Sequence, residues 1–282
     1  FDFLFGCFTQ DEKITIPNTV TALDDNSFMG ISSLKEIIIP NSVTSIGNGC
    51  FSKCISLDNV IIPNQKTRIN DYTFKECTSL SNISIPESVI YIGCYCFSGC
   101  KSLNHIKYLN KIKTISKCSF ENCTSLKQFA IPLSIQSIDE GAFSQCSFLE
   151  KIVIPPTVKV IPHKVFDGCV NLKEITIDPY QTKIDENTFS SCSSLTKLII
   201  GSSITKIENH SFDGLTTLKK IIIPNSVTSI DANAFSQCSS LSQIIISTAI
   251  SSIEEYCFAS CSSLKNLIIP LSVTSINAYS FV

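Results

Sequence analysis

The sequence predicts a parallel β-solenoid that is mainly β with short helical turns, built from about eleven to twelve stacked coils of 23 residues each. The first observation is a phenylalanine that recurs every 23 residues without insertion or deletion, at positions 28, 51, 74, 97, 120, 143, 166, 189, 212, 235, 258 and 281. The second is a leucine six residues after each of these phenylalanines from Leu34 to Leu264. The third is an isoleucine five residues before each phenylalanine from Ile46 to Ile276, with Leu23 opening the series. Because one coil cannot bury its own apolar side, such repeats are stable only when stacked.

The first element of each coil is a short strand. In residues 34–39, Leu-Lys-Glu-Ile-Ile-Ile, β-branched residues alternate and place Ile37 and Ile39 on the inner side. A proline follows directly in seven coils, at positions 40, 63, 86, 132, 155, 224 and 270. Because proline lacks the N–H that a strand ladder needs, it ends the strand. Stacking these strands predicts a parallel sheet on one face of the solenoid.

A second extended segment and a polar corner complete the coil. Residues 43–46 place Val43 and Ile46 inward, three positions apart. Polar residues follow, and then a small residue and the recurring phenylalanine. We expect a short helical turn here, with the phenylalanine filling the interior of the coil.

The two ends of the sequence depart from this pattern. Phe5 is in register, but Phe8 and Asp11 replace the Cys and Leu expected after it. We therefore predict a degenerate N-terminal coil over residues 1–13 and a single-domain solenoid over residues 14–282 that stops in mid-coil. An exposed last coil would leave apolar side chains in water and promote association. We therefore expect the natural protein to continue beyond both ends, or another molecule to cover the C-terminal end.

The coil pattern L-x-x-I-x-I-P-x-x-V-x-x-I-x-x-x-A-F-x-x-C resembles the BspA-like, or treponemal-type, leucine-rich repeat over residues 14–282. The resemblance implies a right-handed leucine-rich-repeat solenoid with parallel strands on one face. It also implies a place among surface-exposed and secreted proteins of bacteria and protozoan parasites. Some members of that family are adhesins that bind host matrix proteins or partner cells.

The fifteen cysteines mostly belong to one position of the repeat. Nine stand three residues after the recurring phenylalanine, and Ile31 and Leu215 fill the other two sites. Replacement by Ile and Leu indicates a buried packing position, where a free cysteine behaves as a small apolar side chain. We therefore expect mostly free thiols, although disulfides between neighbouring coils are the alternative.

Composition and motifs exclude several classes of function. The formal net charge is −2 and Arg68 is the only arginine, which argues against nucleic-acid binding. The sequence contains no run of 18 apolar residues, which is about the length needed to span a membrane. The three histidines occupy different repeat positions, and no phosphate-binding glycine motif occurs. We expect no catalytic residue, no cofactor and no metal, and the chain is not expected to be an enzyme.

The candidate partner-binding face lies on the outer side of the predicted strands. Four consecutive isoleucines face outward near the C-terminal end, and lysines lie on or beside the same strands. The candidate residues are Ile199, Ile222, Ile245, Ile268, Lys151, Lys173, Lys197, Lys219 and Lys220. Two interpretations stay open: the isoleucines suit any strand and are covered by lysine stems, or they form a contact surface.

These observations predict a non-catalytic protein–protein interaction solenoid, by family resemblance a surface-exposed or secreted adhesion-type protein. The expected partner is a protein, namely a host or cell-surface protein if the resemblance holds. Self-association through the sheet face or the open C-terminal coil is a second prediction. The alternative is an intracellular, cytoplasmic scaffold of the same fold, or the targeting domain of a larger protein.

Overall fold

The computed structural model describes residues 12–107, 110–177, 179–265 and 267–282. The chain forms two compact units, Phe1–Leu126 (unit 1) and Lys127–Val282 (unit 2). The degenerate coil predicted for residues 1–13 falls almost entirely outside the described residues.

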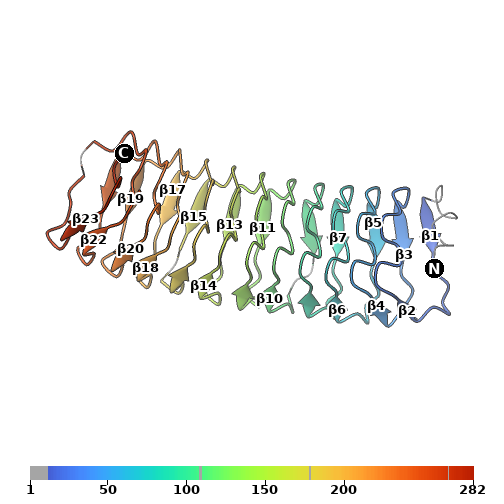
Figure 1. The fold of residues 1–282 in the computed structure, drawn as a ribbon. Helices are drawn as coiled ribbons and strands as arrows, with labels where there is room; N and C mark the ends of the chain where they lie inside the picture. Colours follow the sequence, from blue (N-terminus) through green and yellow to red (C-terminus); the bar gives the residue numbers. More distant parts are fainter. Residues whose placement is uncertain (1–11, 108–109, 178, 266) are drawn as a thin grey trace. The chain divides into compact units, whose positions relative to one another are not determined.

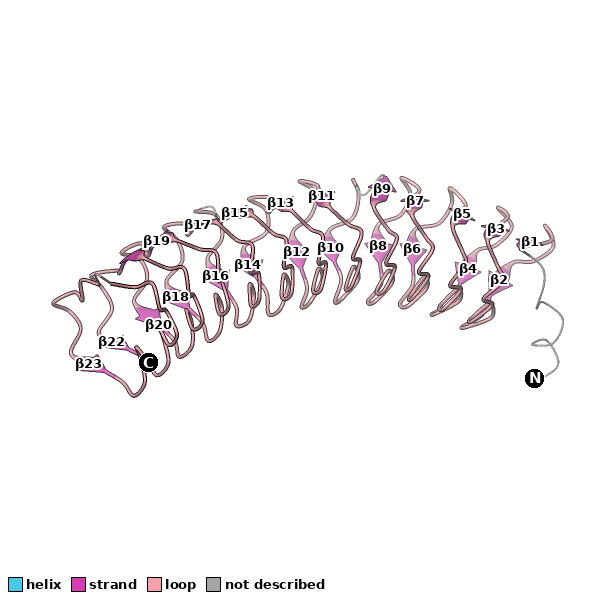
Figure 2. Ribbon diagram, turned by 90° about the horizontal axis from the view of Figure 1, so that it is seen from above, coloured by secondary structure: helices cyan, strands magenta, loops and turns pink. Residues whose placement is uncertain are grey.

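Both units are β-solenoids, and each described coil contributes a three-residue strand followed by a two-residue strand, except the last, which contributes only a two-residue strand (Figures 1 and 2). In unit 1 the strands are β1 (Lys13–Thr15), β2 (Ala22–Leu23), β3 (Glu36–Ile38), β4 (Ser45–Ile46), β5 (Asn59–Ile61), β6 (Arg68–Ile69), β7 (Asn82–Ser84), β8 (Tyr91–Ile92), β9 (His105–Lys107) and β10 (Thr114–Ile115). In unit 2 they are β11 (Gln128–Ala130), β12 (Ser137–Ile138), β13 (Lys151–Val153), β14 (Val160–Ile161), β15 (Glu174–Thr176), β16 (Lys183–Ile184), β17 (Lys197–Ile199), β18 (Lys206–Ile207), β19 (Lys220–Ile222), β20 (Ser229–Ile230), β21 (Gln243–Ile245), β22 (Ser252–Ile253) and β23 (Ser275–Ile276).

The strands pair in parallel, with each residue opposite the one 23 positions further along. In unit 1 the sheets run β1-β3-β5, β7-β9, β2-β4 and β6-β8. In unit 2 they run β11-β13-β15-β17, β19-β21, β14-β16-β18-β20 and β22-β23. Glu174 faces Lys197 and Thr176 faces Ile199 in the pairing of β15 with β17. The structure therefore confirms the predicted solenoid of 23-residue coils.

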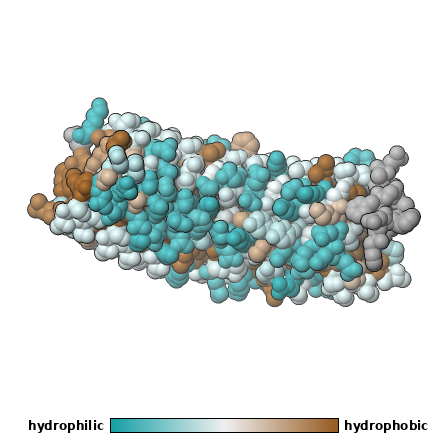
Figure 3. Space-filling view, viewed as in Figure 1, coloured by the Kyte–Doolittle hydropathy of each residue, from teal (hydrophilic) through white to brown (hydrophobic). Residues whose placement is uncertain are grey.

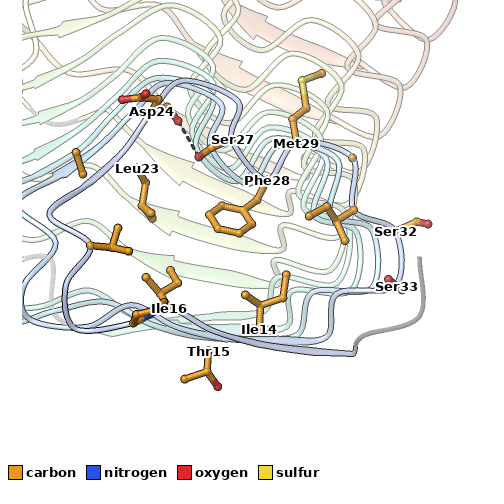
Figure 4. Close-up of a pocket in the computed structure, with 15 residues that line it drawn as sticks. Ile14, Thr15, Ile16, Leu23, Asp24, Ser27, Phe28, Met29, Ser32 and Ser33 are labelled. Carbon is orange, nitrogen blue, oxygen red and sulfur yellow. Dashed lines mark hydrogen bonds between the residues drawn. The ribbon is translucent and has the colours of Figure 1, made fainter. Parts of the chain in front are cut away.

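The recurring phenylalanines form the centre of each unit. From Phe51 to Phe258 they are at most 2% exposed. Successive rings stack with centroids 5.4–5.6 Å apart in unit 1 and 5.3–6.0 Å apart in unit 2. Figure 4 shows one coil in cross-section, with Ile14, Ile16 and Leu23 around the ring of Phe28 and Thr15 turned away. Near-parallel stacking at this spacing adds to the apolar area that each ring buries.

The short helical turns were a wrong prediction, because the described residues around each phenylalanine form a run of turns and contain no helix. The residues two before and two after the phenylalanine have positive φ, as Asn26 (58°) and Gly30 (77°) show around Phe28. A residue in the left-handed region reverses the chain and does not continue a right-handed helix. The backbone N–H groups instead point to the next coil: Asn26 N donates to Asn48 O at 2.9 Å, and Gly30 N donates to Ser52 O at 2.8 Å.

The cysteine position is buried, as predicted, and it also makes a hydrogen bond. The thiol three residues after one phenylalanine donates to the carbonyl oxygen of the preceding phenylalanine. Cys77 Sγ lies 3.1 Å from Phe51 O, and Cys100 Sγ lies 3.1 Å from Phe74 O. Burial raises the pKa of Cys54 to about 12. None of the fourteen described cysteines forms a disulfide, and twelve of them are buried.

Two polar residues replace the inward Val or Ile of the second extended segment. Gln181 is buried, and its Nε2 donates to Val158 O at 3.0 Å. Lys66 is 5% exposed, and its Nζ has no hydrogen-bond partner within the described chain. Burial lowers the pKa of the Lys66 ammonium, because the apolar interior disfavours its charged form. The buried ammonium of Lys66 therefore destabilises the folded state of unit 1.

Candidate partner-binding face

Strand alternation in unit 2 turns a row of isoleucines outward. Ile199, Ile222 and Ile245 end β17, β19 and β21, and they are 45%, 52% and 49% exposed. The preceding residue in each strand, for example Ile221 at 1% exposure, points into the core. Ile222 stands directly opposite Ile245 in the parallel pairing of β19 with β21. These side chains therefore form an apolar stripe over neighbouring strands, in which β17 ends one sheet and β19 begins the next.

Ile268 extends the sequence pattern but not the sheet. It is 84% exposed and lies in a segment without strand structure. Over the coils of unit 2, the face drawn in Figure 3 is mostly hydrophilic, and hydrophobic side chains gather on its C-terminal coils. The predicted stripe is therefore ordered over three strands and continues one coil further as an exposed side chain.

The five predicted lysines are all exposed and lie beside this stripe or in the coils before it. Lys197 and Lys220 begin β17 and β19, two residues before Ile199 and Ile222. Lys219 precedes β19, Lys151 begins β13, and Lys173 precedes β15. We call the nine predicted residues, Ile199, Ile222, Ile245, Ile268, Lys151, Lys173, Lys197, Lys219 and Lys220, the Ile–Lys face.

Carboxylates within unit 2 neutralise part of this positive charge. Lys173 Nζ lies 2.8 Å from Glu150 Oε2, and Lys197 pairs with Glu174. Hydrogen bonding to Lys173 lowers the pKa of Glu150, and Lys127 on the other side acts in the same direction.

Glu174 has the same arrangement. Lys197 lowers its pKa by hydrogen bonding and by charge, and Lys151 adds to the effect. Each glutamate therefore lies between two lysines 23 residues away on either side. The sequence prediction named the lysines but missed these triads, which the 23-residue spacing of alternating charges could have revealed.

Lys219 and Lys220 differ from the other lysines of the Ile–Lys face. In the described part of unit 2, neither forms an ion pair. Their neighbours in the next coil are Ser242 and Gln243, which carry no charge. These two ammonium groups remain available to a partner next to the apolar stripe.

Two histidines lie close to carboxylates. His210 Nδ1 lies 3.2 Å from Asp213 Oδ2, and His163 Nδ1 lies 3.5 Å from Glu186 Oε1. These His–acid pairs were not foreseen from the sequence. No group of three or more His, Cys, Asp or Glu side chains within the described residues could hold a metal ion.

An apolar cavity of about 600 Å³ lies in the interior of the first described coil (Figure 4). It is lined by Ile14, Ile16, Leu23 and Phe28. Phe51, the counterpart of Phe28 in the next coil, is fully buried and stacks between Phe28 and Phe74. The cavity is therefore the space that a stacked coil fills, and we assign it no ligand.

Comparison with known families decides the classification. A family model described as BspA type leucine rich repeat region, in six copies, matches residues 2–93, 67–196 and 182–282. The chain belongs to this family. The BspA-type repeat accounts for the 23-residue period and for the conserved spacing of strand, corner and phenylalanine within this one chain.

Solved structures support the same classification. A leucine-rich cell surface protein from Faecalibacterium prausnitzii is 26% identical, with a TM-score of 0.61 over 94% of this chain and 78% of that one. A leucine-rich repeat protein from Bacteroides ovatus is 25% identical, with a TM-score of 0.56 over 90% of this chain and 85% of that one. The pneumococcal vaccine antigen PcpA is 19% identical and shares the fold, with a TM-score of 0.66 over 97% of this chain and 86% of that one.

A search of curated protein sequences found no match to this BspA-type chain. Among the described residues, no helix has the length and apolar character needed to cross a membrane.

Proposed function

We propose that this BspA-type solenoid binds a protein partner through the Ile–Lys face, without catalysis. The observation that carries the proposal is the row of Ile199, Ile222 and Ile245, held half-exposed on neighbouring strands of unit 2. A contiguous apolar stripe rimmed by charged side chains is typical of protein interaction sites. The strands fix these side chains before binding, which reduces the entropy lost on association.

We further propose that the protein acts at a cell surface or after secretion, as an adhesion-type protein. The support is the similarity to the F. prausnitzii cell surface protein and to the pneumococcal antigen. An intracellular scaffold of the same fold, or a targeting domain of a larger protein, is the alternative, and free thiols suit it. Labelling of intact cells with a membrane-impermeant biotin reagent separates the two, because a protein that never becomes biotinylated is not at the surface.

The binding test replaces Ile222 and Ile245 by lysine in one variant. Each side chain has about half its surface left to bury, which is worth about 1 kcal/mol per residue. Losing both should weaken binding by about 2 kcal/mol, or roughly 30-fold in Kd. The assay measures binding of the purified chain to immobilised extracellular-matrix proteins, to host cells and to itself.

The matched control is Ile38→Lys plus Ile61→Lys. These residues occupy the same outward repeat position in unit 1 and stand opposite each other in the pairing of β3 with β5. Circular dichroism should show an intact fold for both variants. Unchanged binding by the Ile222/Ile245 variant, or an equal loss in the control, would remove the Ile–Lys face from consideration.

A further inference from the structure

We propose that the partner of the Ile–Lys face is an acidic protein segment that also carries apolar side chains. This inference rests on the proposed function and specifies the chemistry of the bound partner. It follows from the distribution of charge over the outward strand positions, which differs between the two units.

In unit 2, the positions seven, eight and ten residues after the recurring phenylalanine carry seven lysines and only two glutamates. The lysines are Lys127, Lys151, Lys173, Lys197, Lys219, Lys220 and Lys265, and the glutamates are Glu150 and Glu174. The strand face of this unit is therefore strongly positive, although the whole chain has a formal net charge of −2. An excess of one sign on one face attracts partners of the opposite sign.

The same positions in unit 1 are balanced. The described residues there carry three cations and three anions, namely Lys13, Lys35, Lys107, Glu12, Glu36 and Asp58. Four of these groups pair between coils, with Lys13 Nζ 3.1 Å from Glu36 Oε2 and Lys35 Nζ 2.6 Å from Glu12 Oε1. The positive excess is therefore a property of unit 2 and not of the repeat itself.

The unpaired positive charge of unit 2 lies next to the apolar stripe. Glu150 and Glu174 neutralise lysines of the earlier coils, whereas no acidic residue occupies the outward strand positions after Glu174. Lys219 and Lys220 lie in that part, beside Ile199, Ile222 and Ile245. A segment that buries apolar side chains on the isoleucines places its neighbouring side chains over these ammonium groups, where carboxylates are favoured and further cations are repelled.

A protein segment fits this surface better than an anionic membrane. The outward strand positions of unit 2 hold no aromatic side chain, and the three isoleucines that lie in strands, Ile199, Ile222 and Ile245, are half-buried. Peripheral membrane binding relies on apolar and aromatic groups that penetrate below the lipid headgroups. A flat stripe of three isoleucines is instead complementary to the side chains of another protein.

The experiment selects peptides from a random dodecapeptide library displayed on phage, using the full chain as bait. We expect the selected peptides to combine Asp or Glu with Ile, Leu, Val or Phe. Their affinity should fall about tenfold or more when ionic strength rises from 50 to 500 mM, which shortens the Debye length from about 14 to about 4 Å. Lys219→Glu plus Lys220→Glu should weaken binding at least tenfold.

The matched control is Lys107→Glu plus Lys111→Glu, which changes the net charge equally but lies in unit 1. It should leave peptide affinity within a factor of two. An equal loss in the control would show that total charge and not the Ile–Lys face decides binding, and would overturn the inference.

The remaining outcomes separate the inference from the proposed function. Peptides that lose binding in the Ile222→Lys plus Ile245→Lys variant but show no acidic bias would overturn the acidic partner and leave the proposed function standing. Peptides that depend on neither pair of residues would overturn both. Two outcomes would point to another occupant of the Ile–Lys face. Binding to phosphatidylglycerol vesicles that Lys219→Glu plus Lys220→Glu abolishes would overturn the inference in favour of a lipid. Self-association in sedimentation velocity that the same variant abolishes would overturn it in favour of a second copy.

Discussion

Replacing Phe166 by alanine tests whether the stacked phenylalanines hold the solenoid together. Phe166 is fully buried, and its ring lies 6.0 Å from that of Phe143 and 5.6 Å from that of Phe189. Removing a buried phenylalanine costs about 3–5 kcal/mol, and this one stacks on both sides. We therefore expect a loss of about 4 kcal/mol.

The assay is thermal unfolding followed by circular dichroism. At about 2.1 cal/mol/K per residue, the unfolding entropy of 282 residues is roughly 0.6 kcal/mol/K, so 4 kcal/mol corresponds to a fall in Tm of about 7 °C. The control is Phe148→Ala in the same unit, because Phe148 is 52% exposed and lies outside the stack. It should lower Tm by about 1 °C. A shift below 2 °C for Phe166→Ala, or equal shifts for both variants, would refute the packing account.

Two further predictions concern residues buried in the coils. Titration with a thiol reagent under denaturing, non-reducing conditions should count nearly fifteen thiols. The native protein at pH 8 should react slowly, because burial raises the pKa of Cys54 to about 12. A count near one in the denatured protein would mean a disulfide ladder. Lys66→Met should stabilise the chain by about 1–3 kcal/mol at pH 7, since it removes a buried ammonium without a hydrogen-bond partner. Because the pKa of Lys66 is lower in the folded state, the folded chain loses the Lys66 proton at a lower pH than the unfolded chain. The stability of the wild type should therefore rise relative to Lys66→Met as pH approaches 10.5. Equal pH dependence of the two proteins in urea titrations would contradict this.

The repeat itself could be predicted because its recurring positions hold large apolar residues, which must be buried. Phenylalanine at an unbroken spacing of 23, with Ile37 and Ile39 alternating in a strand, has no stable solution except stacked coils. The inward orientation of Val43 and Ile46 was also predicted correctly, and both are buried.

The turns around the phenylalanines could not be predicted from residue preference alone. Asparagine and glycine tolerate positive φ, and they occupy several of these positions, for example Asn26 and Gly30. Tyr72 and Tyr95 adopt the same backbone conformation, which bulky residues rarely do. Their rings stack with centroids 5.2 Å apart, so contacts between coils accompany a conformation that the local sequence disfavours.

The candidate face was predictable in its residues but not in its electrostatics. Strand alternation alone placed Ile199, Ile222 and Ile245 outward. The pairing of Lys197 with Glu174 depends on the register between coils, which decides which charges are neutralised and which stay available. The thiol hydrogen bonds likewise depend on where the preceding phenylalanine carbonyl points, and cysteine composition carries no information on that.

Lysine footprinting of the bound chain tests the central claim, binding through the Ile–Lys face, most directly. A lysine-specific reagent acetylates the chain in two states, namely unbound and bound to the matrix protein or cells that retain it. Mass spectrometry then gives the acetylation rate at each lysine. We predict that Lys197, Lys219 and Lys220 become protected on binding, while Lys13 and Lys35 in unit 1 react at unchanged rates. Protection of Lys13 and Lys35 with unchanged rates at Lys219 and Lys220 would contradict the account.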